Sequence, residues 1–94
     1  MALRDISHAV VDGNYVRVWF QGQRAMLARS LNALESRLDP ALFFRANRNT
    51  LVNLRQIASI DPWVNDGYQI RLRDGSEIEV SRRQGRELRE RLSL

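Results

Sequence analysis

The sequence has no cysteine and no lysine, and it contains a single histidine. Without cysteine the chain has neither a disulfide framework nor a thiolate metal site, and a reducing compartment such as the cytoplasm fits. The one histidine, His8, has no metal-ligand spacing around it, and no glycine-rich phosphate loop is present. We therefore expect no enzymatic activity, no catalytic residue, no cofactor and no metal.

The sequence also lacks any long hydrophobic run. A membrane-spanning helix needs roughly 20 consecutive apolar residues, and Arg4 and Asp5 interrupt the N-terminus before a signal peptide could form. We expect a cytoplasmic protein with no membrane contact by this segment. The 94 residues are 44% hydrophobic and 28% charged, which are ordinary globular values. They predict a single domain over residues 1–94 with one compact core.

What the chain has in abundance is arginine, which accounts for all 15 basic residues, with a net charge of +4. Two explanations remain open. Guanidinium groups pair well with phosphate and with guanine edges, and a GC-rich genome would also favour arginine codons. The excess gathers in two places, at Arg45 and Arg48 and at Arg82, Arg83 and Arg86.

The first third of the chain has the pattern of a β-meander. Residues 6–11 and 15–20 are rich in β-formers, and the Asp12-Gly13 pair between them is a strong hairpin signal. Gln21-Gly22 predicts a second turn, and residues 24–28 a third strand. A mainly β fold is therefore expected.

A short helix should follow the meander. Leu31, Leu34 and Leu38 recur at helical spacing, and Ser30 is a suitable N-cap. Asp39-Pro40 should end the helix after about two turns.

A second hairpin is predicted where residues 68–73 and 77–80 alternate between apolar and charged side chains. A three-residue loop over residues 74–76 would set Leu72 opposite Ile78. That register gathers the apolar residues on one face and sets opposite charges across from each other on the solvent face.

A C-terminal helix is predicted from Ser81 onward. Ser81 and Gln84 have capping-box spacing, and Leu88 and Leu92 share one helical face. Gly85 should weaken the start of this helix.

Polar side chains concentrate on three connections between the predicted elements. Arginine reads guanine and asparagine reads adenine through paired hydrogen bonds, while arginine, serine and the N–H groups at a helix start bind phosphate. Arg82 and Arg83 would oppose the helix macrodipole unless an anion binds there. The candidate residues are Asn14 in the first turn, Arg45, Asn47, Arg48 and Asn49 after the strand at Phe43-Phe44, and Ser81, Arg82, Arg83 and Arg86 at the last helix.

Ordinary structural roles compete with these assignments. Turn chemistry alone would account for Asn14, since asparagine favours turns. Asn53 is expected to satisfy loop backbone groups, and His8 to be a structural histidine within a strand.

Two further functions use the aromatic residues. Tyr15, Trp19 and Trp63 around Arg17 could form an exposed patch for a protein partner. Alternatively, stacking of bases on Tyr15 and Trp19 could bind single-stranded RNA.

Four motifs together point to a known family. Phe43–Asn53 has the spacing F-x-R-x-x-R-x-x-x-V-N; G-N-Y-V precedes it, and a D-G hairpin with V-S-R-R at its exit follows. In this the chain resembles the LytTR family of DNA-binding domains, the output module of many bacterial two-component response regulators. The resemblance implies an elongated, multi-sheet β fold with short helices and three sheets. It also implies that loops, rather than a recognition helix, enter successive major grooves of double-stranded DNA and make this a domain of a transcriptional regulator.

The resemblance carries roles to individual positions. It implies base contacts for Asn14, Arg48 and Arg82. It implies phosphate contacts for Arg45, Asn47, Asn49, Ser81, Arg83 and Arg86. Where the family commonly has R-x-H-R-S, this chain has Asn47 in place of histidine and Asn49 in place of serine, which keeps hydrogen-bond donors but leaves the base preference open.

The resemblance also concerns partners. The small contact area of one copy is compatible with a second copy on repeated sites. The family's receiver domain is absent from these residues, so a receiver or sensor domain is expected elsewhere in the full-length protein.

Overall fold

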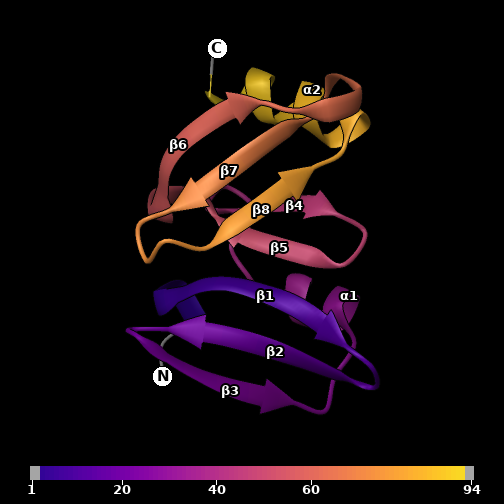
Figure 1. Ribbon diagram of the computed structural model, residues 1–94. Helices are drawn as coiled ribbons and strands as arrows, with labels where there is room; N and C mark the ends of the chain where they lie inside the picture. Colours follow the sequence, from indigo (N-terminus) through magenta and orange to yellow (C-terminus); the bar gives the residue numbers. More distant parts are fainter. Residues whose placement is uncertain (1–2, 93–94) are drawn as a thin grey trace.

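A computed structural model describes residues 3–92, and it is mainly β with short helices, as predicted (Figure 1). The first and last two residues of the predicted domain 1–94 lie outside the described residues. The strands are β1 (Ile6–Asp12), β2 (Tyr15–Phe20), β3 (Gln23–Leu27), β4 (Phe43–Asn47), β5 (Thr50–Asn53), β6 (Ile57–Pro62), β7 (Tyr68–Leu72) and β8 (Glu77–Val80). The helices are α1 (Leu31–Glu35) and α2 (Arg82–Leu92), with short 3₁₀ turns η1 (Leu3–Asp5), η2 (Leu54–Gln56) and η3 (Val64–Asp66).

The strands form two antiparallel sheets. One has the order β3-β2-β1-β5-β4 and the other β6-β7-β8. The resemblance implied three sheets. Within residues 3–92 there are two, because β1 pairs with both neighbours and joins the meander to the β4–β5 hairpin. Its ladder with β5 runs from His8 opposite Val52 to Val10 opposite Thr50. The molecule is elongated, with extents of 33 × 23 × 22 Å.

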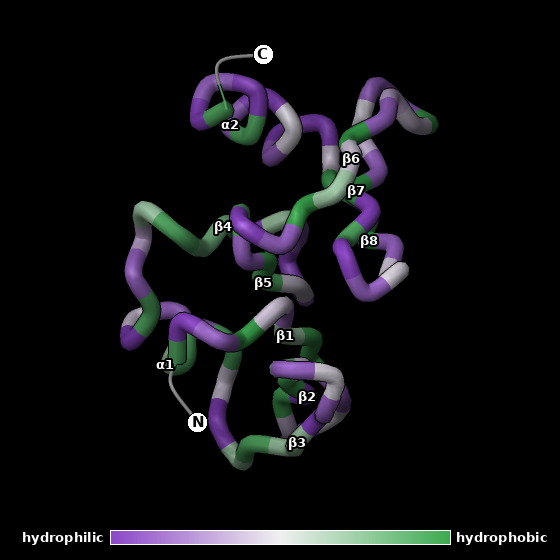
Figure 2. The backbone as a smooth tube through the Cα atoms, turned by 90° about the vertical axis from the view of Figure 1, so that its left-hand side faces the viewer, coloured by the Kyte–Doolittle hydropathy of each residue, from purple (hydrophilic) through white to green (hydrophobic). Residues whose placement is uncertain are grey.

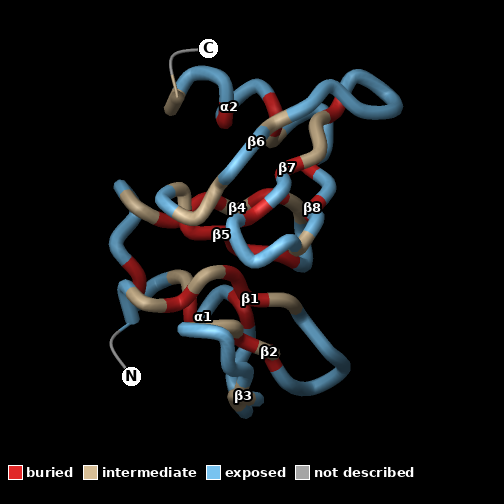
Figure 3. Tube along the Cα trace, turned by 60° about the vertical axis from the view of Figure 1, so that its left-hand side comes forward, coloured by how far each residue is buried: buried red, intermediate tan, exposed pale blue. Residues whose placement is uncertain are grey.

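The β4–β5 hairpin separates two hydrophobic clusters, where the composition suggested one compact core. Successive residues of a strand face opposite sides, and here both sides are apolar. Phe43 and Leu51 belong to the cluster with β1, β2 and α1, whereas Phe44 and Val52 belong to the cluster with β7, β8 and α2. We call β1–β3 with α1 the N-terminal half and β6–β8 with α2 the C-terminal half. Figure 3 shows buried chain concentrated at the hairpin between them.

The two turns of the meander are confirmed. Gly13 and Asn14 form a two-residue loop, and Gly13 has φ +61° at the first central position, as a type II′ turn requires. Gln21 and Gly22 have φ +48° and +75°, the pattern of a type I′ turn. The two turns therefore lie at opposite ends of β2.

Helix α1 is shorter than predicted. Ser30 caps it as expected, accepting a hydrogen bond from the Ala33 N–H at 3.0 Å. The α-helix ends at Glu35 because the Arg37 and Leu38 N–H groups bond three residues back, to Leu34 O at 3.0 Å and Glu35 O at 3.1 Å. Leu38 remains buried in the core of the N-terminal half without being helical.

The register predicted for the β7–β8 hairpin is wrong by two residues. Ile70 pairs with Ile78, and Arg71 pairs with Glu77. The loop has three residues as expected, but they are 73–75, closed by the Leu72 N–H donating to Ser76 O at 2.9 Å. The reason is Gly75, which has φ +91° and takes the last loop position, where a left-handed residue is needed. The face assignment survives because a two-residue shift preserves alternation.

Helix α2 begins as predicted, but Gly85 has a role that its helix propensity concealed. Ser81 Oγ accepts from the Gln84 N–H at 3.4 Å, while the Ser81 N–H donates to Ala46 O instead of completing a reciprocal capping box. Gly85 is buried, and a Cβ there would lie 2.7 Å from a ring carbon of Tyr68. The glycine lets α2 approach β7. In Figure 2 the helix shows hydrophobic and hydrophilic stretches in alternation, as a surface helix with one buried face should.

Candidate nucleic-acid interface

The structure brings two of the predicted contact turns together at one end of the strands of the five-stranded sheet. Strands β1 and β5 are antiparallel, so the end of β1 lies beside the start of β5. The Val11 N–H donates to Asn49 O at 2.9 Å, which ties the turn at Asn14 to the turn at Arg48.

The third connection, between β8 and α2, is held at the same end of the sheet. The Asn47 side chain donates from Nδ2 to Glu79 O at 2.8 Å, and the Ser81 N–H donates to Ala46 O at 3.3 Å. In Figure 1 the β1–β2 turn, the β4–β5 turn and the β8–α2 junction all lie on the right-hand flank, one above another. Asn14, Arg48 and Arg82 therefore belong to connections that share one side of the molecule.

An open concavity of about 730 Å³ lies between the upper two of these connections. It gathers five of the predicted contact residues, but not Asn14, Arg45, Arg83 or Arg86. Two acids also line it, so its charge is mixed. The lining residues are Asn47, Arg48, Asn49, Trp63, Val64, Asn65, Asp66, Gly67, Glu79, Val80, Ser81 and Arg82.

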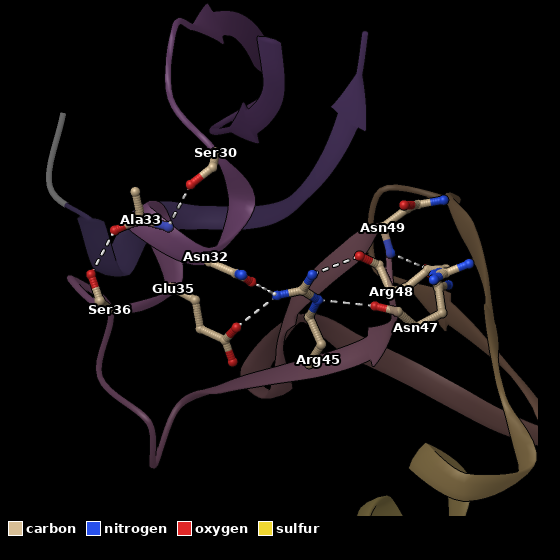
Figure 4. A network of polar contacts seen from close by, with 9 residues as sticks. All are labelled: Ser30, Asn32, Ala33, Glu35, Ser36, Arg45, Asn47, Arg48 and Asn49. Atoms are coloured by element: carbon tan, nitrogen blue, oxygen red, sulfur yellow. Dashed lines mark hydrogen bonds and ion pairs between the residues drawn. The ribbon is translucent and has the colours of Figure 1, made fainter. Parts of the chain in front are cut away.

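Arg45 is committed to contacts inside the protein (Figure 4). Its guanidinium donates to Asn32 Oδ1 and Glu35 Oε1 of α1, both at 2.8 Å. It also donates to the carbonyl oxygens of Asn47 at 3.1 Å and Arg48 at 2.6 Å. Because Arg45 bridges α1 and the backbone of the Arg48 turn, its geometry suits a positioning residue rather than a phosphate contact.

A β-bulge explains why the side chains of Arg45 and Asn47 hydrogen-bond to different elements on opposite sides of the hairpin. The prediction treated these residues as a loop, but β4 continues to Asn47, with a register shift between Arg45 and Asn47. Without the shift, residues two apart would face the same side. With it, Arg45 faces α1, whereas Asn47 faces β8. The Asn47 side chain also accepts from the Asn49 N–H at 2.9 Å, so both ends of its amide stabilise the turn.

Apart from Ser81, whose Oγ accepts from the Gln84 N–H, the other candidate side chains make no hydrogen bond or ion pair to the protein within residues 3–92. Each nevertheless carries several donors or acceptors. Each is exposed, and Arg82 and Arg83 occupy the first turn of α2, where they oppose the helix macrodipole. These side chains are Asn14, Arg48, Asn49, Arg82, Arg83 and Arg86.

His8 and Asn53 have the structural roles expected of them. His8 is buried and stacks on Trp19 with ring centroids 4.3 Å apart, and Ser7 Oγ lies 3.0 Å from its Nδ1. Burial lowers the pKa of His8, and the nearby Asp74 carboxylate opposes this only in part. Asn53 donates to Ile6 O at 3.0 Å and accepts from the Arg55 N–H at 2.9 Å, satisfying backbone groups at a chain crossing.

The aromatic residues of the competing hypotheses occupy separate places. Trp19 has one face on His8, and the Arg17 guanidinium lies 5.9 Å from its ring centroid. Trp63 lies instead in the concavity beside Arg48 and Arg82. From the sequence, Trp63 was considered only as part of an aromatic patch for a protein partner, and no DNA contact was assigned to the β6–β7 loop. The available sequence signal was the Trp63-Val64 pair directly before the turn-forming Asn65-Asp66-Gly67, which places two apolar residues at a loop.

Two possible features are absent from the part of the chain that the structure describes. No helix there combines the length and apolar character needed to cross a membrane. No three histidine, aspartate or glutamate side chains of residues 3–92 come together as a metal site.

Known proteins resemble this chain in both sequence and fold. The chain is 31% identical over its whole length to the sensory transduction protein LytT of Enterococcus faecalis, and 32% identical over 98% of its length to the transcriptional regulatory protein YpdB of Escherichia coli K12. It covers 39% and 38% of these relatives. A solved structure described as the LytTr DNA-binding domain of a methyl-accepting/DNA response regulator from Bacillus cereus shares its fold, with a TM-score of 0.91 at 19% identity over 100% of this chain and 86% of that one.

The family assignment rests on the match along the sequence. The family model for the LytTr DNA-binding domain matches residues 1–93. The motifs around Phe43–Asn53 and the V-S-R-R segment fall within this range, and the fold agrees with that of a solved family member. The chain therefore belongs to the LytTR family of DNA-binding domains.

Proposed function

We propose that this domain binds double-stranded DNA sequence-specifically, as part of a bacterial transcriptional regulator, with Asn14, Arg48 and Arg82 contacting base edges in the major groove. The observation that carries the proposal is the set of unused guanidinium and carboxamide groups on three connections along one flank. The long axis of 33 Å is close to the roughly 34–36 Å of one turn of B-DNA. A duplex could therefore present successive grooves to the two ends of this flank.

Phosphate contacts are assigned to Asn49, Ser81, Arg83 and Arg86. Arg83 and Arg86 lie in the first turns of α2, where the helix N-terminus adds positive potential. Arg45 and Asn47 hold the Arg48 turn in place and have no DNA contact in this proposal. Each of the two arginine–phosphate contacts should add nearly one unit to the salt dependence of binding, whereas the neutral Asn49 and Ser81 contacts should add little.

The whole regulator is larger than this domain in the proposal. The chain spans about two fifths of the length of the relatives it matches. We infer that a receiver or sensor domain lies elsewhere in the full-length protein and that a second copy binds on repeated DNA sites. A DNA partner implies action in the bacterial cytoplasm.

The test compares a selected duplex with a scrambled one. Binding sites are selected from a random duplex library, and affinities are measured by mobility shift. Arg82→Ala should lower affinity for the selected site by about 1–3 kcal/mol and reduce discrimination between the two duplexes. Arg86→Ala should weaken both equally. The matched control is Arg24→Ala, an exposed arginine beside the β2–β3 turn at the opposite end of the meander.

One pattern would remove the proposal of direct base contacts. Equal losses on selected and scrambled duplexes for Asn14→Ala, Arg48→Ala and Arg82→Ala would mean that these residues contribute charge or shape but no base discrimination. Losses as large for Arg24→Ala would mean that the flank has no special role.

A further inference from the structure

The β6–β7 loop, residues 63–67, presents apolar surface at the edge of the proposed DNA interface. Trp63 is 44% exposed and Val64 is 65% exposed, the highest value among the large hydrophobic residues of the described chain. The tip of this loop is hydrophobic in Figure 2. Single exposed apolar residues are ordinary, but this pair borders the concavity that contains Arg48 and Arg82.

The loop has a fixed conformation. The Trp63 N–H donates to Gly67 O at 2.9 Å, and the Gly67 N–H donates to Val64 O at 3.1 Å. Between them, Asn65 and Asp66 have φ values of +57° and +61°, a left-handed backbone that asparagine and aspartate tolerate better than most residues. Two successive residues in this region are unusual, and such conformations often accompany contact sites.

The same loop is docked onto the strand that leads to Arg82. Gly67 packs so closely against β8 that a Cβ on it would lie 2.5 Å from Val80 O. Val80 precedes Arg82 by two residues. The loop and Arg82 are therefore held as one unit, and a duplex that reaches Arg82 comes close to Val64.

We propose that the β6–β7 loop is a further DNA-contacting element in which Val64 packs against the 5-methyl group of a thymine next to the base contacted by Arg82. Apolar side chains recognise thymine in the major groove through this methyl group. Asp66 lies in the same loop and would repel a phosphate, which favours placing the loop over base edges instead of the DNA backbone. This inference rests on the proposed function.

The experiment removes single methyl groups from the DNA. In the duplex selected by the wild-type domain, each thymine in turn is replaced by deoxyuridine, which lacks only the 5-methyl group, and affinities are measured for wild type and Val64→Ala. One replacement should weaken wild-type binding roughly fourfold, the value of about one buried methyl group. The same replacement should have little effect on Val64→Ala.

Two variants control for indirect effects. Val64→Thr keeps one methyl group and should remain sensitive to the same thymine. Met26→Ala removes another exposed apolar side chain, 48% exposed on edge strand β3 outside the concavity, and should behave as wild type. Circular dichroism should be the same for all variants, since Val64 is exposed.

The possible failures are distinct. In one case the wild-type domain selects a sequence, but every deoxyuridine replacement changes the affinity of wild type and Val64→Ala by the same factor. The thymine contact is then overturned, while the proposed function stands. If the wild-type domain selects no sequence, the proposed function fails and this inference fails with it.

Discussion

The two halves of the molecule reach the same flank by different means. The N-terminal half contributes the Asn14 turn, a two-residue loop whose shape follows from local chemistry at Gly13. The C-terminal half contributes a composite surface, in which the β6–β7 loop packs against a separate segment, the end of β8 that leads to Arg82. The β4–β5 hairpin belongs to both, since its two faces enter different cores.

The difference shows where mutations should remain local and where they should spread. Removing the Asn14 side chain should affect one contact, because that turn depends on few tertiary contacts. In the C-terminal half, a change in β7, β8 or α2 should displace several contact residues together, because tight packing couples them.

The largest expected effect tests whether the halves unfold separately. Phe43 and Phe44 are adjacent and almost fully buried, yet they lie in different cores. Each substitution to alanine should destabilise the protein by about 3–5 kcal/mol. Phe44→Ala should cost more, because it also removes the ring beneath the Arg91 guanidinium. Denaturant unfolding gives these values.

Hydrogen exchange on the same two variants sharpens the comparison. Phe43→Ala should reduce amide protection first in β1–β3, and Phe44→Ala first in β6–β8 and α2. Identical loss of protection throughout the chain in both variants would show a single cooperative unit and remove the distinction between the halves.

A glycine in the C-terminal half should show the next largest effect. Gly85→Ala would add a Cβ only 2.7 Å from the Tyr68 ring. Overpacking of this kind should outweigh the gain in helix propensity, with a net loss of about 1–2 kcal/mol. In a Tyr68→Leu background the same substitution should become neutral or stabilising, since the ring is gone. Stabilisation by Gly85→Ala in the wild-type background would show that α2 does not need this close approach.

The hairpin between the halves can be tested through Arg45. Arg45→Lys keeps the charge but cannot span Asn32, Asn47 O and Arg48 O together. If Arg45 positions the Arg48 turn, affinity for the selected duplex should fall about tenfold, or about 1.4 kcal/mol. Glu35→Gln, which keeps an acceptor for Arg45, should change affinity far less. An equal loss of affinity for scrambled DNA would indicate a phosphate contact by Arg45 instead.

The smallest effect concerns His8 in the N-terminal half. Its pKa is lowered by burial, so the native state binds fewer protons than the unfolded chain below the ordinary histidine pKa of about 6.5. The stability that neutral His8 supports is complete above that pH and is lost as the pH falls below it. His8→Phe keeps an aromatic ring on Trp19 without a titrating group, so its unfolding free energy should fall less between about pH 7.5 and about pH 5.5. Parallel curves for the two proteins would contradict this.

Much of the fold was predictable because the relevant physics is local. Alternation of apolar residues assigned the strands and their buried faces, and glycine-containing pairs marked the turns of the meander. Ser30 and Ser81 marked the helix starts. The register of β7–β8 was missed although its cause is also local, namely the need of Gly75 for the last loop position.

The sequence predicted which residue types form the candidate site, but not which of them hold the fold together and which are left to contact DNA. From the sequence, Arg45 and Arg48 were placed in one cluster and both were expected to contact DNA, Arg45 at a phosphate and Arg48 at a base. The structure separates them, because Arg45 finds partners in α1, 10 and 13 residues earlier in the chain, whereas the Arg48 side chain finds none within residues 3–92.

The sequence by itself determined the strands of the meander and of the β7–β8 hairpin, the turns of the meander, and which side chains carry hydrogen-bonding groups that could contact DNA. Only the tertiary structure decided that three distant connections share one flank, that Arg45 is used internally and that Gly85 and Gly67 allow close packing. The physical reason is the distance along the chain over which each interaction acts. Backbone preferences and alternation act over a few residues, whereas the partner of a donor and the neighbour of a missing Cβ depend on which remote segments the two cores bring together.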